Sequence, residues 1–237
     1  DLPPAAGWLD PVQTAARGFM VVIQDTRGRS ASDGEWDPFR FEREDGFDSV
    51  QWAARLEGSS GRVGMYGASY WGNSQWMAAA ERPACLAAIA PSITWSDPMD
   101  GLFARGGAVE LGLAVHWTLQ QGFGHLQRVC ADGDRDAAVD RMIGDFDHLR
   151  EEGYWGLPVI EMPVLGRHSV PDIGSIRALK DSSVRERCRV DRIYDEVEVP
   201  AFHLGGWHDI FLQGTLDNHQ AMVDRGVESR LLVGPWT

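Results

Sequence analysis

The stretch "GMYGASYWG" (64–72) decides the fold, because it places a single serine between a strand pattern and a helix pattern. The preceding "RVGMYG" (62–67) is a short apolar run typical of a buried strand. The following "YWGNSQWMAAA" (70–80) is rich in small residues and is helix-like. A strand, a tight turn carrying Ser69 and then a helix is the context that defines a nucleophile elbow.

The small size of the residues around the serine has a structural reason in such an elbow. Gly67 and Gly72 are small enough to let strand and helix pass close together. The turn would also aim the backbone N–H of Tyr70 at the place where an oxyanion forms. The sequence departs from the G-x-S-x-G motif, however, because Trp71 occupies the position of the second glycine. Spacing alone therefore leaves two interpretations open, a catalytic serine and a plain strand-to-helix turn.

The rest of the chain continues the alternation of strands and helices. Further strands are predicted at 18–28, 85–92, 200–209 and 230–237, and helices at 48–56, 106–123, 135–155 and 212–226. No convincing strand is visible between about Trp95 and Val197. We therefore predict an α/β doubly wound, mostly parallel sheet with a helical cap insertion. The predicted domains are 1–96 (first part of the core), 97–196 (cap) and 197–237 (second part of the core).

Composition excludes several classes of protein. The net charge of −13 over 237 residues argues against a nucleic-acid partner, which needs basic patches. The three cysteines lie far apart without a CxxC pair, so neither a metal site nor a disulfide framework is predicted. No apolar run approaches transmembrane length, so no membrane association is expected. The compartment stays open, with a soluble cytoplasmic protein favoured, and the sequence does not indicate an oligomeric state.

Several motifs, in order along the chain, resemble the cocaine esterase and X-Pro dipeptidyl-peptidase family of α/β-hydrolases (CocE/NonD-type acyl esterases). The family's elbow is G-x-S-Y-x-G, which accounts for the displaced glycine and for Tyr70. The resemblance covers essentially the whole chain, and the helical middle is its least specific part. It rests on "DTRGRSASDGEW" (25–36), "VGMYGASYWGNSQW" (63–76), "AIAPS" (88–92), "GGWHDIFLQGTL" (205–216) and "RLLVGPW" (230–236).

The resemblance implies a role for five residues. It places the nucleophile on Ser69, the backbone oxyanion donor on Tyr70 and the acid that orients the triad histidine on Asp209. Phe103 and Trp117 match positions where cap aromatics line the acyl pocket, although ordinary packing within the cap explains them equally well. Asp25 and Arg27, in "DTRG", are interpreted as structural.

The family's general base follows "GPW[ST]", so the histidine would come directly after Thr237. The second oxyanion donor, a tyrosine hydroxyl, would lie before Asp1, so we expect this stretch alone to be inactive. Among the histidines within the chain, His208 adjoins Asp209, but adjacent side chains point in different directions and do not converge on Ser69. We therefore interpret His208 as structural or solvent-exposed, with substrate contact as the alternative.

The expected function is that of a serine hydrolase that cleaves carboxylic esters, or amides, through an acyl-enzyme. It would act on a small-molecule ester or acyl substrate and would need no metal and no organic cofactor. An X-Pro dipeptidyl-peptidase or α-amino-acid ester hydrolase is the alternative within the class. A catalytically silent binding module with the hydrolase fold is the alternative outside it. A dinucleotide-binding enzyme is disfavoured, because no G-x-G-x-x-G follows the first apolar run.

Overall fold

Two compact units make up the protein, of which the structure, a computed structural model, describes residues 10–130, 132–168 and 177–236. Unit 1 comprises the chain up to Gln24, Phe41–Asp97 and the chain from Cys188 onward. Unit 2 comprises Asp25–Arg40 and Pro98–Arg187.

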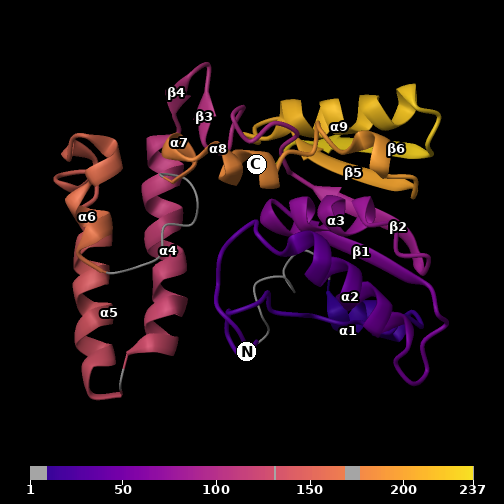
Figure 1. The fold of residues 1–237 in the computed structure, drawn as a ribbon, viewed down its shortest axis with the longest axis horizontal. Coiled ribbons are helices and arrows are strands. Elements are labelled where there is room, and N and C mark those ends of the chain that lie inside the picture. The colour runs from indigo at the N-terminus through magenta and orange to yellow at the C-terminus, as the bar shows by residue number, and fades with distance from the viewer. Residues whose placement is uncertain (1–9, 131, 169–176, 237) are drawn as a thin grey trace. The chain divides into compact units, whose positions relative to one another are not determined.

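Unit 1 is built on a four-stranded sheet with the strand order β1-β2-β5-β6 (Figure 1). All three neighbouring pairs are parallel, as the sequence predicts for an α/β core. The strands are β1 (Val63–Ala68), β2 (Leu86–Ser92), β5 (Ala201–Gly206) and β6 (Ser229–Gly234). The helical elements are α1 (Pro11–Ala16), α2 (Glu42–Ala54), α3 (Tyr70–Ala80), η4 (Tyr194–Glu196) and α9 (Leu212–Asp224).

Two crossover helices connect the parallel strands. Helix α3 leads from β1 to β2 and packs against both, and α9 does the same between β5 and β6. Helix α2 packs closely on α3, since a Cβ added at Gly46 would lie 2.6 Å from the Cβ of Ala78. The register pairs Ala68 with Ser92, Ser92 with Leu204 and Gly206 with Gly234. The four strands therefore end together at one edge of the sheet.

The core of unit 1 explains why the predicted strands and helices form. Apolar side chains from the strands, from α3 and from α9 are removed from water together, which is the dominant favourable contribution to folding. Buried members of this cluster are Val50, Trp76, Met77, Ala79, Ala80, Leu86, Ile89, Val190, Ile193, Val197, Ala201 and Met222.

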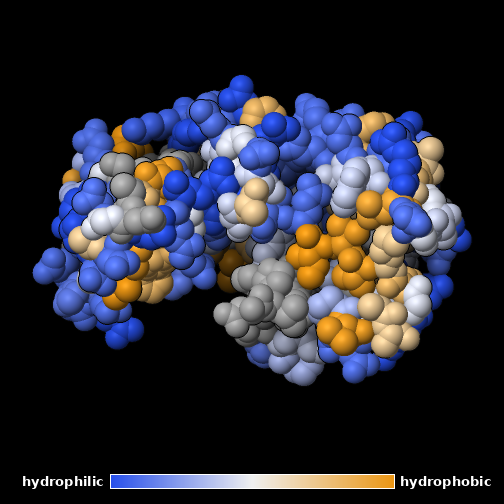
Figure 2. Space-filling view, turned by 90° about the horizontal axis from the view of Figure 1, so that it is seen from below, coloured by the Kyte–Doolittle hydropathy of each residue, from blue (hydrophilic) through white to orange (hydrophobic). Residues whose placement is uncertain are grey.

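The strand predicted at 18–28 is wrong. Residues 19–26 belong to no strand, and Phe19 is 66% exposed. Within the described residues, the sheet has the order β1-β2-β5-β6, and 19–26 pairs with none of its strands. Figure 2, which views the molecule from below relative to Figure 1, shows apolar side chains gathered on the visible face of unit 1. Exposed apolar residues in this part of unit 1 are Val12, Phe19, Met20, Val22, Ile23 and Trp52.

Unit 2 is mainly helical, as predicted for the middle of the chain, but it also contains a short antiparallel pair of two-residue strands. Its strands are β3 (Ala104–Arg105) and β4 (Ala108–Val109). Its α-helices are α4 (Leu111–Val129), α5 (Asp132–Asp147), α6 (Pro163–Gly166), α7 (Arg177–Lys180) and α8 (Ser182–Arg187), with 3-10 turns η2 (Gly153–Trp155) and η3 (Val159–Glu161). A second core, which includes Leu119, Met142 and Val164, joins α4, α5 and α6.

The boundaries of the units differ from the predicted domains in two places. Residues 25–40 belong to unit 2, because Arg29 donates hydrogen bonds to Gln121 at 3.1 and 2.8 Å. Arg128 of α4 also donates to the carbonyl oxygens of Ser30 and Ser32. Residues 188–196 belong to unit 1. That unit 2 acts as a cap stays a prediction.

No helix in the described ranges is both long and apolar enough to cross a membrane.

Candidate active site

Ser69 occupies the sharp turn between β1 and α3. Its backbone has φ 56° and ψ −119°, a conformation that residues other than glycine rarely adopt. Such strain persists only where the surroundings fix it, and it concentrates at functional sites. Here the Ser69 N–H donates to the carbonyl of Ser92 at 3.0 Å, and the hydroxyl of Thr94 donates to the Ser69 carbonyl at 2.8 Å. The turn is therefore held from the end of the neighbouring strand.

Two glycines make this turn possible. Gly67 has φ 152°, and a Cβ there would lie 2.6 Å from the Cβ of Trp71. A Cβ on Gly72 would lie 2.8 Å from the Cβ of Thr94 and 3.2 Å from the carbonyl oxygen of Ser92. The contacts of 2.6 and 2.8 Å are too short for a real side chain. The small residues thus allow the close approach of strand and helix that the sequence suggested.

Tyr70 is the first residue of α3, so its backbone N–H lies at the positive end of that helix. Its hydroxyl donates a hydrogen bond to Oε1 of Glu42, the first residue of α2. The other carboxylate oxygen of Glu42 accepts the N–H of Phe41 at 3.1 Å. Tyr70 is therefore anchored both through the backbone of the elbow and through its side-chain hydroxyl.

Asp209 follows β5 in a short turn before α9. Its N–H donates to the carbonyl of Gly206 at 3.1 Å, and its own carbonyl accepts the N–H of Leu212 at 3.2 Å. The side chain is half-buried, whereas the neighbouring His208 is exposed. The N–H of His208 donates to the carbonyl of Trp236 at 3.4 Å, so the segment that follows β6 passes beside this turn.

Ser69, Tyr70 and Asp209 therefore lie at one edge of the sheet, the carboxyl ends of its parallel strands. Ligands of open α/β sheets bind outside this edge. Strand β2 separates the strands that carry the serine and the aspartate. Thr94 links the two sides, because its hydroxyl donates to Ser69 and its carbonyl accepts the hydroxyl of Thr215 in α9 at 3.3 Å.

A buried hydrogen-bonded network supports the loop after β2. Asn73 Nδ2 and Trp95 Nε1 both donate to the carbonyl of Cys188, at 3.0 and 2.9 Å. The hydroxyl of Tyr194 lies 2.7 Å from the hydroxyl of Ser96, and burial raises the pKa of this tyrosine. Buried hydrogen bonds of this kind restrict the arrangement of the core, although Oδ1 of Asn73 has no hydrogen-bond partner among the described residues. We infer that the network keeps Thr94 in place beneath the elbow.

The two aromatic residues predicted to line an acyl pocket lie in unit 2. Phe103 is fully buried, and its ring centroid lies 6.2 Å from that of Phe39 in an edge-to-face contact. Trp117 is half-buried, and its ring centroid lies 6.3 Å from that of Phe39. Both residues thus take part in packing within unit 2. Their contact with an acyl group stays a prediction.

Comparison with known proteins identifies the family of the chain. Residues 4–237 match the family described as X-Pro dipeptidyl-peptidase (S15 family). The chain belongs to this family. It is also 31% identical over 236 residues to the cocaine esterase of Rhodococcus sp. (strain MB1 Bresler), covering 98% of this chain and 40% of that protein. The chain thus spans about two fifths of the length of this relative.

Solved structures confirm the α/β-hydrolase fold of this S15 family member. An aminopeptidase from a marine sediment Thaumarchaeota archaeon matches with a TM-score of 0.68 at 20% identity, covering 95% of this chain and 39% of that chain. An α-amino acid ester hydrolase matches with a TM-score of 0.61 at 20% identity, covering 95% and 38%. At this identity the likeness concerns the fold.

Two contributors to the site of this S15 family member were missed by sequence reasoning, Glu42 and Thr94. Glu42 lies 28 positions before Tyr70 and Thr94 lies 25 positions after Ser69. Neither residue belongs to a recognisable motif, and the contacts arise only when α2, α3 and β2 assemble. No local signal in the sequence pointed to them.

Proposed function

We propose that the protein is a serine hydrolase that cleaves carboxylic esters through an acyl-enzyme. The observation that supports this most is the strained turn at Ser69, with φ 56° and ψ −119°, between a parallel strand and a helix. In such an elbow the hydroxyl projects from the sheet edge and attacks the carbonyl carbon of the ester. The alcohol leaves, and water then releases the acid.

The neighbouring groups have separate roles in this proposal. The backbone N–H of Tyr70, at the start of α3, stabilises the negative oxygen of the tetrahedral intermediate. The carboxylate of Asp209 orients a histidine base and stabilises its protonated form. The histidine base stays the one expected directly after Thr237. The backbone just before that position is hydrogen-bonded to the turn that leads to Asp209, since the N–H of His208 donates to the carbonyl of Trp236.

A peptidase or α-amino-acid ester hydrolase remains the second candidate, since the family is described as X-Pro dipeptidyl-peptidase. Recognition of a substrate ammonium group would need an uncompensated carboxylate. In unit 1 the carboxylates of Asp97 and Asp191 are both within ion-pair distance of Arg189, at 3.2 and 2.5 Å. These two carboxylates are therefore already compensated, so neither is proposed as the ammonium-binding group. Comparing p-nitrophenyl butyrate with alanyl-proline p-nitroanilide would separate the two candidates.

The test of the nucleophile is Ser69→Ala in the intact protein. Loss of a group that works as a unit with its base should lower turnover of p-nitrophenyl esters by about 10⁴-fold or more. A fluorophosphonate probe should label wild type at Ser69 and leave the variant unlabelled. Ser74→Ala is the matched control, because Ser74 lies on the same helix and its hydroxyl donates only to the carbonyl of Trp71.

Two outcomes would contradict the proposal. Retention of about a tenth of wild-type turnover by Ser69→Ala would show that another group is the nucleophile. A wild-type protein that the probe does not label would support a silent binding module.

A further inference from the structure

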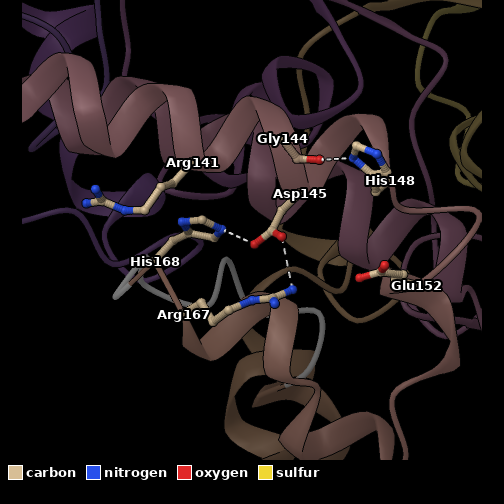
Figure 3. A pocket seen from close by; sticks show the side chains of 7 residues that line it. All are labelled: Arg141, Gly144, Asp145, His148, Glu152, Arg167 and His168. Atoms are coloured by element: carbon tan, nitrogen blue, oxygen red, sulfur yellow. Dashed lines mark hydrogen bonds and ion pairs between the residues drawn. The ribbon is translucent and has the colours of Figure 1, made fainter.

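Unit 2 contains a polar pocket of about 510 Å³ that none of the proposed catalytic residues lines. This volume is within the range of small-molecule sites. Residues from the second half of α5, from the turn that follows it and from the end of α6 form its wall (Figure 3). The lining residues are Arg141, Gly144, Asp145, His148, Glu152, Arg167 and His168.

Asp145 fixes two cations of this pocket. Its Oδ2 lies 2.7 Å from Nε2 of His168, and its Oδ1 lies 3.0 Å from the guanidinium of Arg167. The side chain of His168 is only 5% exposed, so its ring is held by packing as well as by the carboxylate. A carboxylate accepts hydrogen bonds, so Nε2 carries the proton of this bond and Nδ1 is directed elsewhere.

Arg141 is the second arginine that lines the pocket. Within the described residues its guanidinium has no hydrogen bond and no ion pair, although it lines the same pocket as His168. Figure 3 shows the guanidinium of Arg141 on the side of the His168 ring away from Asp145. The side chains of Arg141 and Asp145 are four positions apart on α5, so they project from the same face of the helix.

The other charges of the pocket lie apart from this group. His148 and Glu152 are drawn at the opposite end, beyond Asp145. Nδ1 of His148 lies 2.7 Å from the carbonyl oxygen of Gly144, and this contact and the nearby Glu152 help to raise the pKa of His148. The negative charge of Glu152 thus faces His148, and the negative charge of Asp145 faces Arg167 and His168. Among the described residues, Arg141 is the arginine of the pocket that forms no ion pair, although Asp145 lies one turn away on the same face of α5.

We propose that this pocket binds a small oxyanion, a carboxylate or a sulfate- or phosphate-like group, between Arg141 and Nδ1 of His168. The planar guanidinium offers paired N–H donors to two oxygens of such a group. Nδ1 can add a third hydrogen bond, and it donates only when both ring nitrogens of the imidazole carry a proton.

The test is calorimetric titration of the intact protein with sodium sulfate and, separately, with sodium acetate, at constant ionic strength set by sodium chloride. Both anions are fully ionised at about pH 7, where the titration is carried out. Wild type should bind with saturation. Arg141→Gln should weaken binding by about tenfold or more, as expected for loss of a charge-assisted contact.

Two further variants make the test specific. Arg150→Gln is the matched control, because Arg150 is exposed, follows α5 and does not line the pocket. It should bind as wild type does. His168→Gln should weaken binding, whereas His148→Gln should bind as wild type does. If His168→Gln does not fold, the comparison of Arg141 with Arg150 still decides.

Several outcomes would overturn the proposal. Titration without saturation at millimolar anion concentrations would show that the pocket binds neither anion. Equal affinity in wild type and Arg141→Gln, or equal losses in Arg141→Gln and Arg150→Gln, would show a general effect of surface charge. Binding by sulfate alone would limit the ligand to sulfate- and phosphate-like groups, and binding by acetate alone would limit it to carboxylates. Either selective result would support the site.

Discussion

The hydroxyl of Tyr70 donates a hydrogen bond to the carboxylate of Glu42, which joins the first turn of α3 to the first turn of α2. The helices also touch where Gly46 meets Ala78, so the contact is part of a close interface. The backbone N–H proposed to stabilise the oxyanion belongs to the same Tyr70. We therefore predict that Glu42 is a positioning residue for that N–H, because it holds the side chain of Tyr70.

Removing this anchor should affect turnover more than substrate binding. Glu42→Ala should lower kcat on p-nitrophenyl esters by about tenfold, less than the 10²- to 10³-fold typical when an oxyanion donor itself is lost. KM should change little, since the interaction acts in the transition state. Glu42→Gln should recover much of the rate, because its amide oxygen still accepts the hydroxyl.

A double-mutant cycle supplies the control. Tyr70→Phe removes the same hydrogen bond from the other side, so Tyr70→Phe combined with Glu42→Ala should be no slower than the slower single variant. Additive losses would mean that Glu42 acts by another route. A lowered melting temperature with unchanged kcat would assign it a structural role.

Asp209 and His208 are adjacent, yet we expect opposite results from their substitution. Asp209→Asn should lower kcat by on the order of 10³- to 10⁴-fold, because an amide no longer holds the histidine base in its reactive tautomer. His208→Gln should keep nearly full turnover, since His208 is exposed. The two variants differ by one position, so each is the control for the other. Similar losses in both would point to a disturbed turn and not to a catalytic carboxylate.

The elbow was the most predictable part of the protein. Strand β1, the turn at Ser69 and α3 were all identified because their signal is local: an apolar run, glycines at the points of close approach and small residues in the helix. The conformation of 18–28 was not predictable, because an apolar run becomes a strand only if a neighbouring strand pairs with it. The role of Glu42 was hidden for a related reason, since its contact joins segments far apart in sequence.

Substitution of Phe103 and of Trp117 should have different effects. We expect Phe103 to be a packing residue and Trp117 to be a candidate specificity residue. Phe103 is fully buried against Phe39, so Phe103→Ala should lower the free energy of unfolding by about 3 to 5 kcal/mol. Trp117 is half-buried. If it contacts the acyl group, Trp117→Ala should change the discrimination between benzoyl and acetyl esters, measured as the ratio of their kcat/KM values. The change should be equivalent to about 1 to 3 kcal/mol of activation free energy. Equal losses on both esters with a lowered melting temperature would assign Trp117 to packing as well.

His203 should make the protein sensitive to acid. It lies on β5, almost fully buried, and its ring centroid is 5.8 Å from that of Trp76 and 5.6 Å from that of His219. Burial, with a smaller contribution from the neighbouring His219, lowers the pKa of His203 to about 3. The unfolded chain takes up this proton near pH 6.5, whereas the folded protein does not. The stabilisation is therefore complete above about pH 6.5 and is lost as the pH falls toward 3.

The measurement is the free energy of unfolding in urea between about pH 7 and pH 4, followed by tryptophan fluorescence. For wild type the linkage at His203 should contribute a decrease of up to about 1.4 kcal/mol per pH unit below pH 6.5. His203→Leu removes the titrating group from the core, so its unfolding free energy should fall less steeply. His148→Gln is the control: His148 is exposed and its pKa is raised, so its stabilisation is present at low pH and lost as the pH rises. If wild type and His203→Leu lost stability with the same slope, the acid sensitivity would have to come from groups other than His203.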